Sequence, residues 1–331
     1  MGNEKQVDEI PAEKLDQIIF SFCHLKGNQL SVDSKKDSLT IKKLVELKKR
    51  NAKLKIVLSL GGWSGCATCS DVFSTPKARE EFATSTLALN NYFKTDGIDL
   101  DWEYPSIEGF PGHAYKKEDK ENFSELIKTL RQTLGNNYQL SFAAGGFKRY
   151  LEESVDWKTI MPLVDRVNLM SYDLVNGYST VTGHHTPLYS NDKTTESVDY
   201  AVQYLIKNGV PANKIVIGGA FYTRVWTEVA DVNHGLYQRG KHSDGVNYKS
   251  YDKELTKEKG FDYFWDEKTQ AAYFYNKDKK VFATGDDKKS IRAKTKYVKD
   301  QHLQGIMFWE LTLDNYADGL VNEIDKVKRD K

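Results

Sequence analysis

Short apolar runs alternate with longer amphipathic stretches along most of the 331-residue chain. The apolar runs predict strands, and the stretches with apolar positions three or four residues apart predict helices. The seven predicted strands cover residues 18–23, 55–62, 97–104, 139–146, 166–172, 214–222 and 305–310. The predicted helices cover residues 39–50, 76–93, 120–134, 157–164, 195–208, 289–301 and 315–328. Strict alternation of strands and helices favours an α/β fold with a parallel sheet, of the (β/α)8 barrel type rather than doubly wound.

Residues 225–285 interrupt this alternation. The segment is rich in Tyr, Lys, Asp and Gly, and residues 261–265 and 272–275 alternate with a period of two. This many aromatic residues are not typical of a disordered loop. We therefore predict a barrel built from residues 1–224 and 286–331, and a small α+β insertion subdomain at residues 225–285.

The strand predicted at residues 97–104 carries a row of acidic side chains. Its apolar side chains point one way, and Asp99, Asp101 and Glu103 point the other. The other predicted strands are near-continuous apolar runs, as in a sheet buried on both faces, so a solvated acidic face is the weaker interpretation. Buried like charges this close raise at least one carboxyl pKa. A raised pKa suits a carboxyl to act as a general acid near neutral pH.

This stretch resembles the signature of the family 18 glycoside hydrolases, the chitinases. The pattern Asp-x-x-Asp-x-Asp-x-Glu is complete at Asp96, Asp99, Asp101 and Glu103. In that family the signature lies on the fourth strand of a (β/α)8 barrel. The resemblance extends from about residue 18 to the C-terminus.

The resemblance also predicts where the chain departs from the family. Residues 18–23 correspond to the family's second strand, and the polar residues 1–16, with Pro11 and a short helical piece, do not resemble its first. We therefore expect the first strand to be absent from this sequence, which would leave two edges of the sheet unpaired. The insertion at residues 225–285 resembles the domain that raises one wall of the substrate groove in many family members.

The resemblance implies a role for each acidic residue. Glu103 would protonate the glycosidic oxygen, Asp101 would orient the substrate's acetamido group, and Asp99 would share a proton with Asp101. Asp101 and Glu103 project from one strand with Cα atoms about 6.6 Å apart. They approach the sugar from the same side, so Asp101 is poorly placed as a nucleophile. The family uses the substrate's own acetamido oxygen instead, through an oxazolinium intermediate.

Other strand ends resemble further family motifs. Residues 170–173 resemble Met-x-Tyr-Asp, with Tyr172 expected to donate to the acetamido oxygen, and residues 59–62 resemble Ser-x-Gly-Gly. From the residue types alone, a core tyrosine and a buried structural tryptophan remain alternatives for Tyr172 and Trp309. The residues expected to contact the sugars are Trp63, Tyr104, Met170, Asp173, Tyr222, Arg224, Trp309 and Phe22, with Phe147 a weaker candidate.

Charge and hydropathy exclude some functions. The 48 basic and 47 acidic residues are spread along the chain, so the net charge of +1 provides no basic stripe for nucleic acid or an anionic membrane. No apolar run is long enough to span a bilayer. No signal peptide opens the chain, so the protein is cytosolic or its signal is not part of this sequence. The resemblance implies a secreted, periplasmic or cell-surface enzyme, and we expect a monomer.

The cysteines and histidines do not predict a metal site. Cys66 and Cys69 form a C-x-x-C without the second pair that a zinc site needs, so a local disulfide and two free thiols both remain possible. A location outside the cytoplasm favours the disulfide. Cys23 fits a core position. We interpret His184 and His185 as loop residues, and we expect no metal and no cofactor.

Three functions remain after this reasoning. The first is a chitinase that hydrolyses β-1,4 links between N-acetylglucosamine units with retention, and its partner would be chitin or its oligosaccharides. The second is an endo-β-N-acetylglucosaminidase that acts on N-glycans, and the third is a chitin-binding lectin on the same barrel. The insertion favours the first function over the second, and the presence of Glu103 disfavours the lectin.

Overall fold

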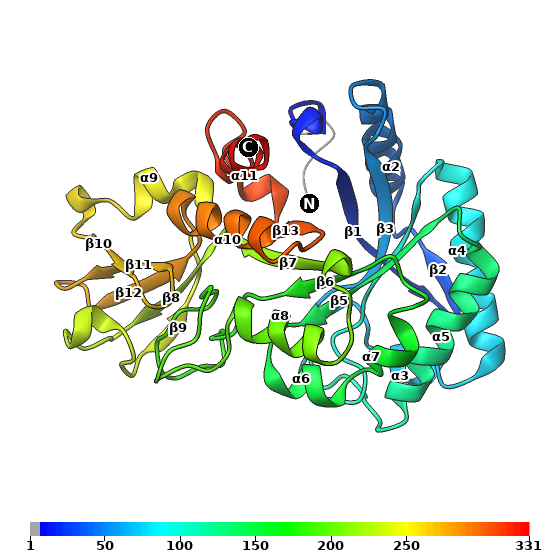
Figure 1. Ribbon diagram of the computed structural model, residues 1–331, viewed down its shortest axis with the longest axis horizontal. Coiled ribbons are helices and arrows are strands. Elements are labelled where there is room, and N and C mark those ends of the chain that lie inside the picture. The colour runs from blue at the N-terminus through cyan, green and yellow to red at the C-terminus, as the bar shows by residue number, and fades with distance from the viewer. Residues whose placement is uncertain (1–6, 331) are drawn as a thin grey trace. The chain divides into compact units, whose positions relative to one another are not determined.

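The computed structural model describes residues 7–330, which form two compact units (Figure 1). The first unit contains the described residues up to Asn168 together with Lys207–Lys214. The second contains Leu169–Ile206 and the described residues from Ile215 onward. Strand β6, Arg166–Met170, belongs partly to each unit.

The first unit is built on a sheet with the strand order β2-β1-β3-β4-β5-β6. Strands β1, β3, β4 and β5 pair in parallel, as expected for strands joined by helical crossovers. The short β2 pairs antiparallel with the end of β1. The strands other than β6 are β1 (Gln17–Lys26), β2 (Gln29–Ser31), β3 (Lys55–Gly61), β4 (Gly97–Asp101) and β5 (Gln139–Gly145).

The helices of the first unit begin at clear sequence signals. The Thr75 hydroxyl accepts a hydrogen bond from the Ala78 N–H, and Pro76 occupies the first turn of α4. Burial of Phe82 on α4 and of Ile127 on α5 covers the apolar strands. These helices are η1 (Ala12–Lys14), α2 (Lys35–Glu46), η2 (Leu47–Lys49), α3 (Cys69–Val72), α4 (Pro76–Phe93), α5 (Asp119–Leu134), α6 (Lys148–Glu153) and α7 (Trp157–Ile160).

The second unit continues the sheet with the order β6-β7-β13. Strands β7 (Ile215–Ala220) and β13 (Gly305–Trp309) pair in parallel. Asp287 and Ser290 form a capping box that starts α10. The helices along this part of the chain are α8 (Val198–Lys207), η3 (Ala212–Lys214), α10 (Lys288–Asp300), η7 (Leu311–Leu313) and α11 (Leu320–Arg329).

Between β7 and α10 lies a separate antiparallel sheet with the order β10-β11-β12-β8-β9. Consecutive residues of β8 face opposite sides, so Trp226 joins one buried cluster with Phe282 and Val225 joins another with Phe274. Its strands are β8 (Thr223–Thr227), β9 (Lys241–Ser243), β10 (Asp262–Asp266), β11 (Ala271–Asn276) and β12 (Val281–Gly285). Its helices are η4 (Asn233–Gly235), η5 (Tyr248–Ser250), α9 (Tyr251–Glu254) and η6 (Lys257–Lys259).

The fold is of the (β/α)8 barrel type, with seven strands at the predicted positions and an antiparallel sheet inserted after β7. We predicted that residues 1–16 contain no strand. Residues 7–16 contain none, and residues 1–6 lie outside the described part of the chain. Among residues 7–330, β2 and β13 are the first and last strands in the order of this sheet. The boundaries predicted for the subdomain, residues 225–285, stay a prediction. Among the described helices, none has the length and apolar character needed to cross a membrane.

Candidate active site

The acidic stretch is buried rather than solvated. All residues of β4 are buried, and Asp99 and Asp101 are only 3% and 7% exposed. Trp102 is buried against Phe73 and Phe123. Strand β4 ends at Asp101, so the prediction of a strand that extends to Tyr104 was wrong. The physical reason is that the loop after β3 takes the next hydrogen bond, from the Gly62 N–H to the Asp101 carbonyl at 2.9 Å.

Asp99 is surrounded by hydrogen-bond donors. Its Oδ1 accepts from Ser141 Oγ at 2.6 Å and from Asn168 Nδ2 at 2.8 Å, and its Oδ2 accepts from Ser59 Oγ at 3.3 Å. Ser59, Asp99 and Ser141 are register partners on adjacent strands, so parallel pairing places them together. Burial raises the pKa of Asp99, and the three donors partly offset this effect.

Asp101 lacks this support. Its Oδ1 is buried and has no hydrogen-bond partner among the described residues. Burial first, and then the charges of Glu103 and Asp99, raise its pKa well above the usual value. Both pKa values are thus raised, but only Asp99 has donors that partly offset the effect of burial.

Asp96 directly precedes β4 and has a structural position. Its Oδ2 accepts the Ile56 N–H at 2.8 Å and forms an ion pair with Lys48 Nζ. These contacts join the starts of neighbouring strands, far along β4 from its acidic end. Glu103 follows two residues after β4 and is half-buried.

The loop after β3 carries Trp63 against the acidic strand. A Cβ atom at Gly61 would lie 2.2 Å from the Asp101 carbonyl oxygen, so only glycine permits this approach. Trp63 is 39% exposed, and its ring centroid lies 6.3 Å from that of Tyr104. The Phe22 ring lies over Gly62, and Phe147 contacts Tyr104 edge-on at 5.3 Å. The four predicted aromatic residues of this unit thus lie around the segment that carries Glu103.

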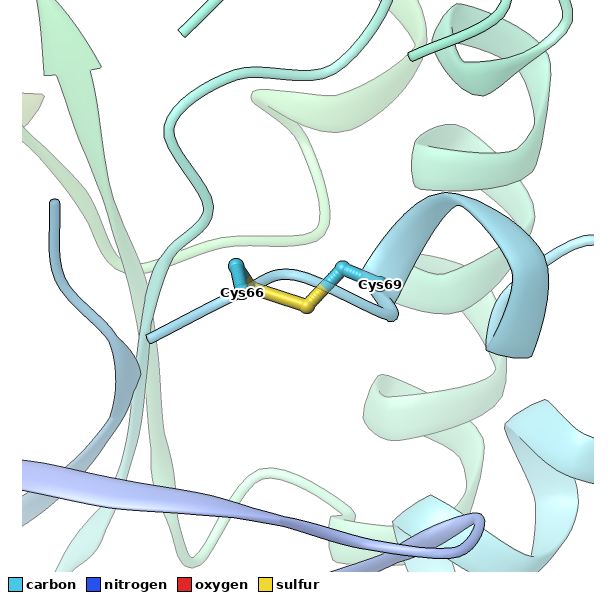
Figure 2. Close-up of a disulfide and its surroundings, with 2 residues drawn as sticks. All are labelled: Cys66 and Cys69. Atoms are coloured by element: carbon cyan, nitrogen blue, oxygen red, sulfur yellow. A yellow bond between two sulfur atoms is a disulfide. The ribbon is translucent and has the colours of Figure 1, made fainter. Parts of the chain in front are cut away.

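A disulfide closes the same loop. Cys66 and Cys69 are bonded, with Cα atoms 5.1 Å apart, and both are buried. Figure 2 shows Cys69 at the start of a short helix, which is α3, and Cys66 in the loop that precedes it. Of the two states left open by the sequence, the disulfide is the one present. Cys23 is a buried free cysteine, as predicted for a core residue.

The second unit holds a cluster around Asp173, which follows β6. Arg224 donates from Nε to Oδ1 at 2.7 Å and from Nη2 to Oδ2 at 2.6 Å, and the Tyr222 hydroxyl donates to Oδ2 at 2.9 Å. Burial raises the pKa of Asp173, but hydrogen bonds from His185 and Arg224 more than offset this and hold the pKa well below its usual range. Asp173 is therefore an ionised carboxylate whose oxygens are already occupied.

His184 and His185 lie in the loop between β6 and α8, as predicted, and both side chains are buried. His185 Nδ1 lies 3.3 Å from both the main-chain nitrogen and Oδ1 of Asp173, and which contact is a hydrogen bond depends on the tautomer. His184 Nε2 lies 3.1 Å from Asp266 Oδ2, and this contact lowers the pKa of Asp266 to about 2. Each histidine therefore supports one buried or half-buried carboxylate. No cluster of metal-ligating side chains occurs between residues 7 and 330.

Three predicted residues lie at strand ends of the second unit. Met170 ends β6 and is half-buried. Tyr172 contacts Tyr222 edge-on with ring centroids 6.4 Å apart, and Gly218 makes room for its ring. Trp309 ends β13 and is 37% exposed, which does not fit a buried structural tryptophan.

Comparisons with known proteins decide the family. The sequence profile of the glycosyl hydrolases family 18 matches residues 1–314. The chain belongs to this family. As a family 18 member it is a glycoside hydrolase, and the matched residues include the acidic stretch from Asp96 to Glu103.

Among its relatives is chitinase A1 of Niallia circulans, 34% identical over 298 residues, which cover 83% of this chain and 42% of that protein. Chitotriosidase-1 of Mus musculus is 30% identical over 92% of this chain and 68% of its own length. The solved structure of a family 18 N-acetylglucosaminidase from Paenibacillus barengoltzii superposes with a TM-score of 0.89 at 35% identity, covering 98% of this chain and 97% of that one. The chain thus spans less than half the length of the first of these relatives and nearly all of the third.

Sequence reasoning missed several residues that support this family 18 site. Ser141 and Asn168 hold Asp99, and His185 holds Asp173. Ser141 could have been found by aligning the parallel strands, because it is the register partner of Asp99. His185 left no such signal, since a loop brings it back to Asp173 from twelve residues further along the chain.

Proposed function

We propose that this family 18 enzyme hydrolyses β-1,4 links between N-acetylglucosamine units in chitin and its oligosaccharides, with retention of configuration. The observation that carries the proposal is the contrast between two buried carboxyls, Asp99 with three donors and Asp101 with an unpartnered oxygen. The names of the relatives, chitinase A1 and chitotriosidase-1, support chitin as the substrate.

In the proposed reaction, Glu103 gives its proton to the glycosidic oxygen as that bond to the anomeric carbon breaks. The acetamido oxygen of the same sugar bonds to the anomeric carbon and forms the cyclic oxazolinium ion. Asp101 orients the acetamido N–H, and Asp99 accepts a share of the Asp101 proton. Water then opens the ring, gives a proton to Glu103 and restores the catalyst.

The properties of the other carboxylates support a nucleophile supplied by the substrate. Burial and the neighbouring charges of Glu103 and Asp99 raise the pKa of Asp101, which disfavours the carboxylate form that a nucleophile needs. Asp173 is ionised, but Arg224 and Tyr222 occupy its oxygens. Neither protonation nor hydrogen bonds from Arg224 and Tyr222 limit the acetamido oxygen of the substrate.

We further propose that aromatic and polar residues bind the sugar chain. Trp63 and Trp309 each expose more than a third of their surface, so a ring face is accessible for stacking on a sugar. Tyr172 would donate to the acetamido oxygen, and Asp173 with Arg224 would bind sugar hydroxyls. Tyr104, Met170, Tyr222 and Phe22 complete the proposed contacts.

We also propose that the enzyme acts outside the cytoplasm. The Cys66–Cys69 disulfide supports this location, because such bonds persist in oxidising compartments and are rare in the cytosol.

Mass spectrometry of reaction products tests the proposed substrate. We expect the enzyme to cleave N-acetylglucosamine hexamers and to leave glucose hexamers from cellulose intact, because glucose has no acetamido group to act as the nucleophile. Products from N-glycans alone would indicate the endo-β-N-acetylglucosaminidase instead. Tight binding of the N-acetylglucosamine hexamer without any product would indicate a lectin.

A further inference from the structure

An ion pair is completely buried beside the end of β7 in the second unit. Lys294 on α10 and Asp286, which directly follows β12, are both 0% exposed. Lys294 Nζ donates to both carboxylate oxygens, at 2.8 Å to Oδ1 and 2.7 Å to Oδ2. Burying two charges costs free energy, and apolar residues of similar volume often stabilise a core as well or better. The pair therefore needs an explanation other than stability.

The carboxylate of the pair holds the end of β7. Asp286 Oδ2 accepts the main-chain N–H of Ala220, the last residue of β7, at 2.8 Å. Its Oδ1 accepts the Ser290 hydroxyl of α10 at 2.7 Å. Ala220 precedes Tyr222 by two residues, and the Tyr222 hydroxyl donates to Asp173. Asp286 thus fixes the point from which the chain continues to Tyr222.

The cation of the pair is connected to the segment that carries Tyr172 and Asp173. Lys294 Nζ donates its third hydrogen bond to Thr186 Oγ1 at 2.5 Å, and the Thr186 hydroxyl donates to the Ser171 carbonyl at 3.0 Å. Ser171 lies between the end of β6 and Tyr172. Two consecutive hydrogen bonds therefore connect Lys294 to the main chain immediately before Tyr172.

The main chain at Asp173 has a conformation that depends on its surroundings. Its φ is +55°, in the left-handed region that residues other than glycine rarely adopt. Such a conformation persists only where the neighbouring structure holds it. After Asp173, the Leu174 N–H donates to the His185 carbonyl at 3.0 Å, and before it Thr186 holds Ser171. The segment is thus held on both sides of Asp173 by two adjacent residues of one loop.

We propose that Lys294 is a positioning residue for the chitinase reaction. Its contacts fix the chain just after β6 and the end of β7, so that Tyr172 and Tyr222 keep their places around Asp173. In the proposed reaction Tyr172 donates to the acetamido oxygen, and a displaced donor would stabilise the oxazolinium ion less well. The inference rests on that proposed function. Lys294 has no exposed surface and acts only through these residues.

Kinetics of Lys294→Met and Thr186→Val on N-acetylglucosamine hexamers test the assignment. Methionine has no ammonium group, and valine keeps the shape of threonine without its hydroxyl. We expect kcat/KM to fall by about 10- to 100-fold in Lys294→Met, because a misplacement of about 1 Å can cost about 100-fold. Loss of one hydrogen bond in Thr186→Val should lower kcat/KM by about 3- to 10-fold. Thr186→Ser keeps the hydroxyl and should keep the wild-type value.

Inhibition by a thiazoline analogue of the oxazolinium ion separates positioning from a loss of folded protein. A partly unfolded sample contains fewer active molecules, but its folded molecules bind the analogue as tightly as the wild type. A displaced Tyr172 weakens binding by every molecule. We therefore expect the Ki of the analogue to rise in Lys294→Met and Thr186→Val by about the factor by which kcat/KM falls.

Lys299→Met is the matched control. Lys299 lies on the same helix, α10, and its Nζ donates to the Val327 carbonyl of α11 at 3.3 Å. The substitution removes an ammonium group from α10 without touching the hydrogen bonds that lead to β6 and β7. We expect it to leave kcat/KM and the Ki of the analogue unchanged.

The possible failures can be told apart. If the wild type releases no product from the hexamer, or is not inhibited by the analogue, the proposed function is wrong. If the wild type does both and folded Lys294→Met keeps its kcat/KM and Ki, the positioning role is overturned. If Lys294→Met does not fold, Thr186→Val decides, because it leaves both members of the ion pair in place. Unchanged kinetics in Thr186→Val, or an equal loss in Thr186→Ser, would then overturn the role.

Discussion

At the scale of single residues, hydrogen-bond donors separate the roles of neighbouring carboxyls. Asp99 receives three donors from three strands, whereas Asp101, two residues later, has a buried oxygen with no partner in the described chain. Donors stabilise the charged form and burial without donors stabilises the neutral form. The two buried carboxyls of this strand therefore differ in how well their charged forms are stabilised.

At Asp173, hydrogen bonds outweigh burial in setting the pKa, and this predicts a change in the pH dependence of activity. Burial raises its pKa, but His185 and Arg224 together hold it well below the usual value. Loss of the Arg224 charge removes one of the two partners that lower the pKa of Asp173. In Arg224→Ala we therefore expect Asp173 to become protonated at higher pH, and the acid limb of the kcat/KM profile to move to higher pH.

The pH profile of Arg224→Lys is the control for that measurement. Lysine keeps the positive charge without the two-pronged contact, so its acid limb should lie between those of the wild type and Arg224→Ala. An acid limb that stays in place in Arg224→Ala would show that the ionisation of Asp173 does not limit activity.

At the scale of elements, the loop after β3 is fixed by close backbone contacts and one covalent bond. Gly61 lies against the Asp101 carbonyl, and a Cβ atom at Gly65 would lie 2.0 Å from the Gly61 carbonyl oxygen. The Cys66–Cys69 disulfide closes the next turn, before α3. Trp63 lies between these fixed points, so its position depends on the whole loop.

Removal of the disulfide should therefore affect both stability and substrate binding. In the chain-entropy description, a crosslink over so short a loop contributes about 2 kcal/mol to the free energy of unfolding. We expect Cys66→Ser with Cys69→Ser to lose about this amount in urea unfolding and to raise KM more than it lowers kcat. Wild-type enzyme kept under reducing agent should match the double variant. Equal stability of oxidised wild type and double variant would contradict this expectation.

The elements also show how far the sequence could predict this structure. Apolar runs are long enough in β3, β5 and β7 to identify them from composition alone, and the signature placed Asp99, Asp101 and Glu103 at a strand end. The actual end of β4 at Asp101 was not predictable, because it depends on a hydrogen bond from Gly62 on another strand's loop. The short β2 escaped notice because three residues carry too little periodicity.

The candidate site, too, could be predicted only in part from the sequence. Tyr172 and Arg224 were predicted because the residues around them resemble motifs of the family. The contact of His185 with Asp173 was not predictable, since His185 lies in a loop twelve residues further along the chain. Contacts of this kind depend on loop geometry, which hydrophobic periodicity does not encode.

At the scale of the whole molecule, the proposed catalyst uses residues from nearly the entire chain, from Phe22 to Trp309. The acidic array belongs to the first compact unit, and the Asp173 cluster belongs to the second. In the proposed reaction, a single side chain of the acidic array donates the proton that releases the leaving sugar. The chain-wide match to glycosyl hydrolases family 18 supports that assignment.

The most direct test is turnover and binding by Glu103→Gln on unactivated N-acetylglucosamine hexamers. Glutamine keeps the shape of the side chain but has no proton to donate, so we expect kcat to fall by about 10²–10⁴-fold. The hexamer Kd should stay within about 3-fold of the wild type, because binding does not require that proton. Glu108→Gln, the same substitution at an exposed position five residues later, should leave both values unchanged. Near wild-type turnover by Glu103→Gln would contradict the assignment of Glu103 as the general acid.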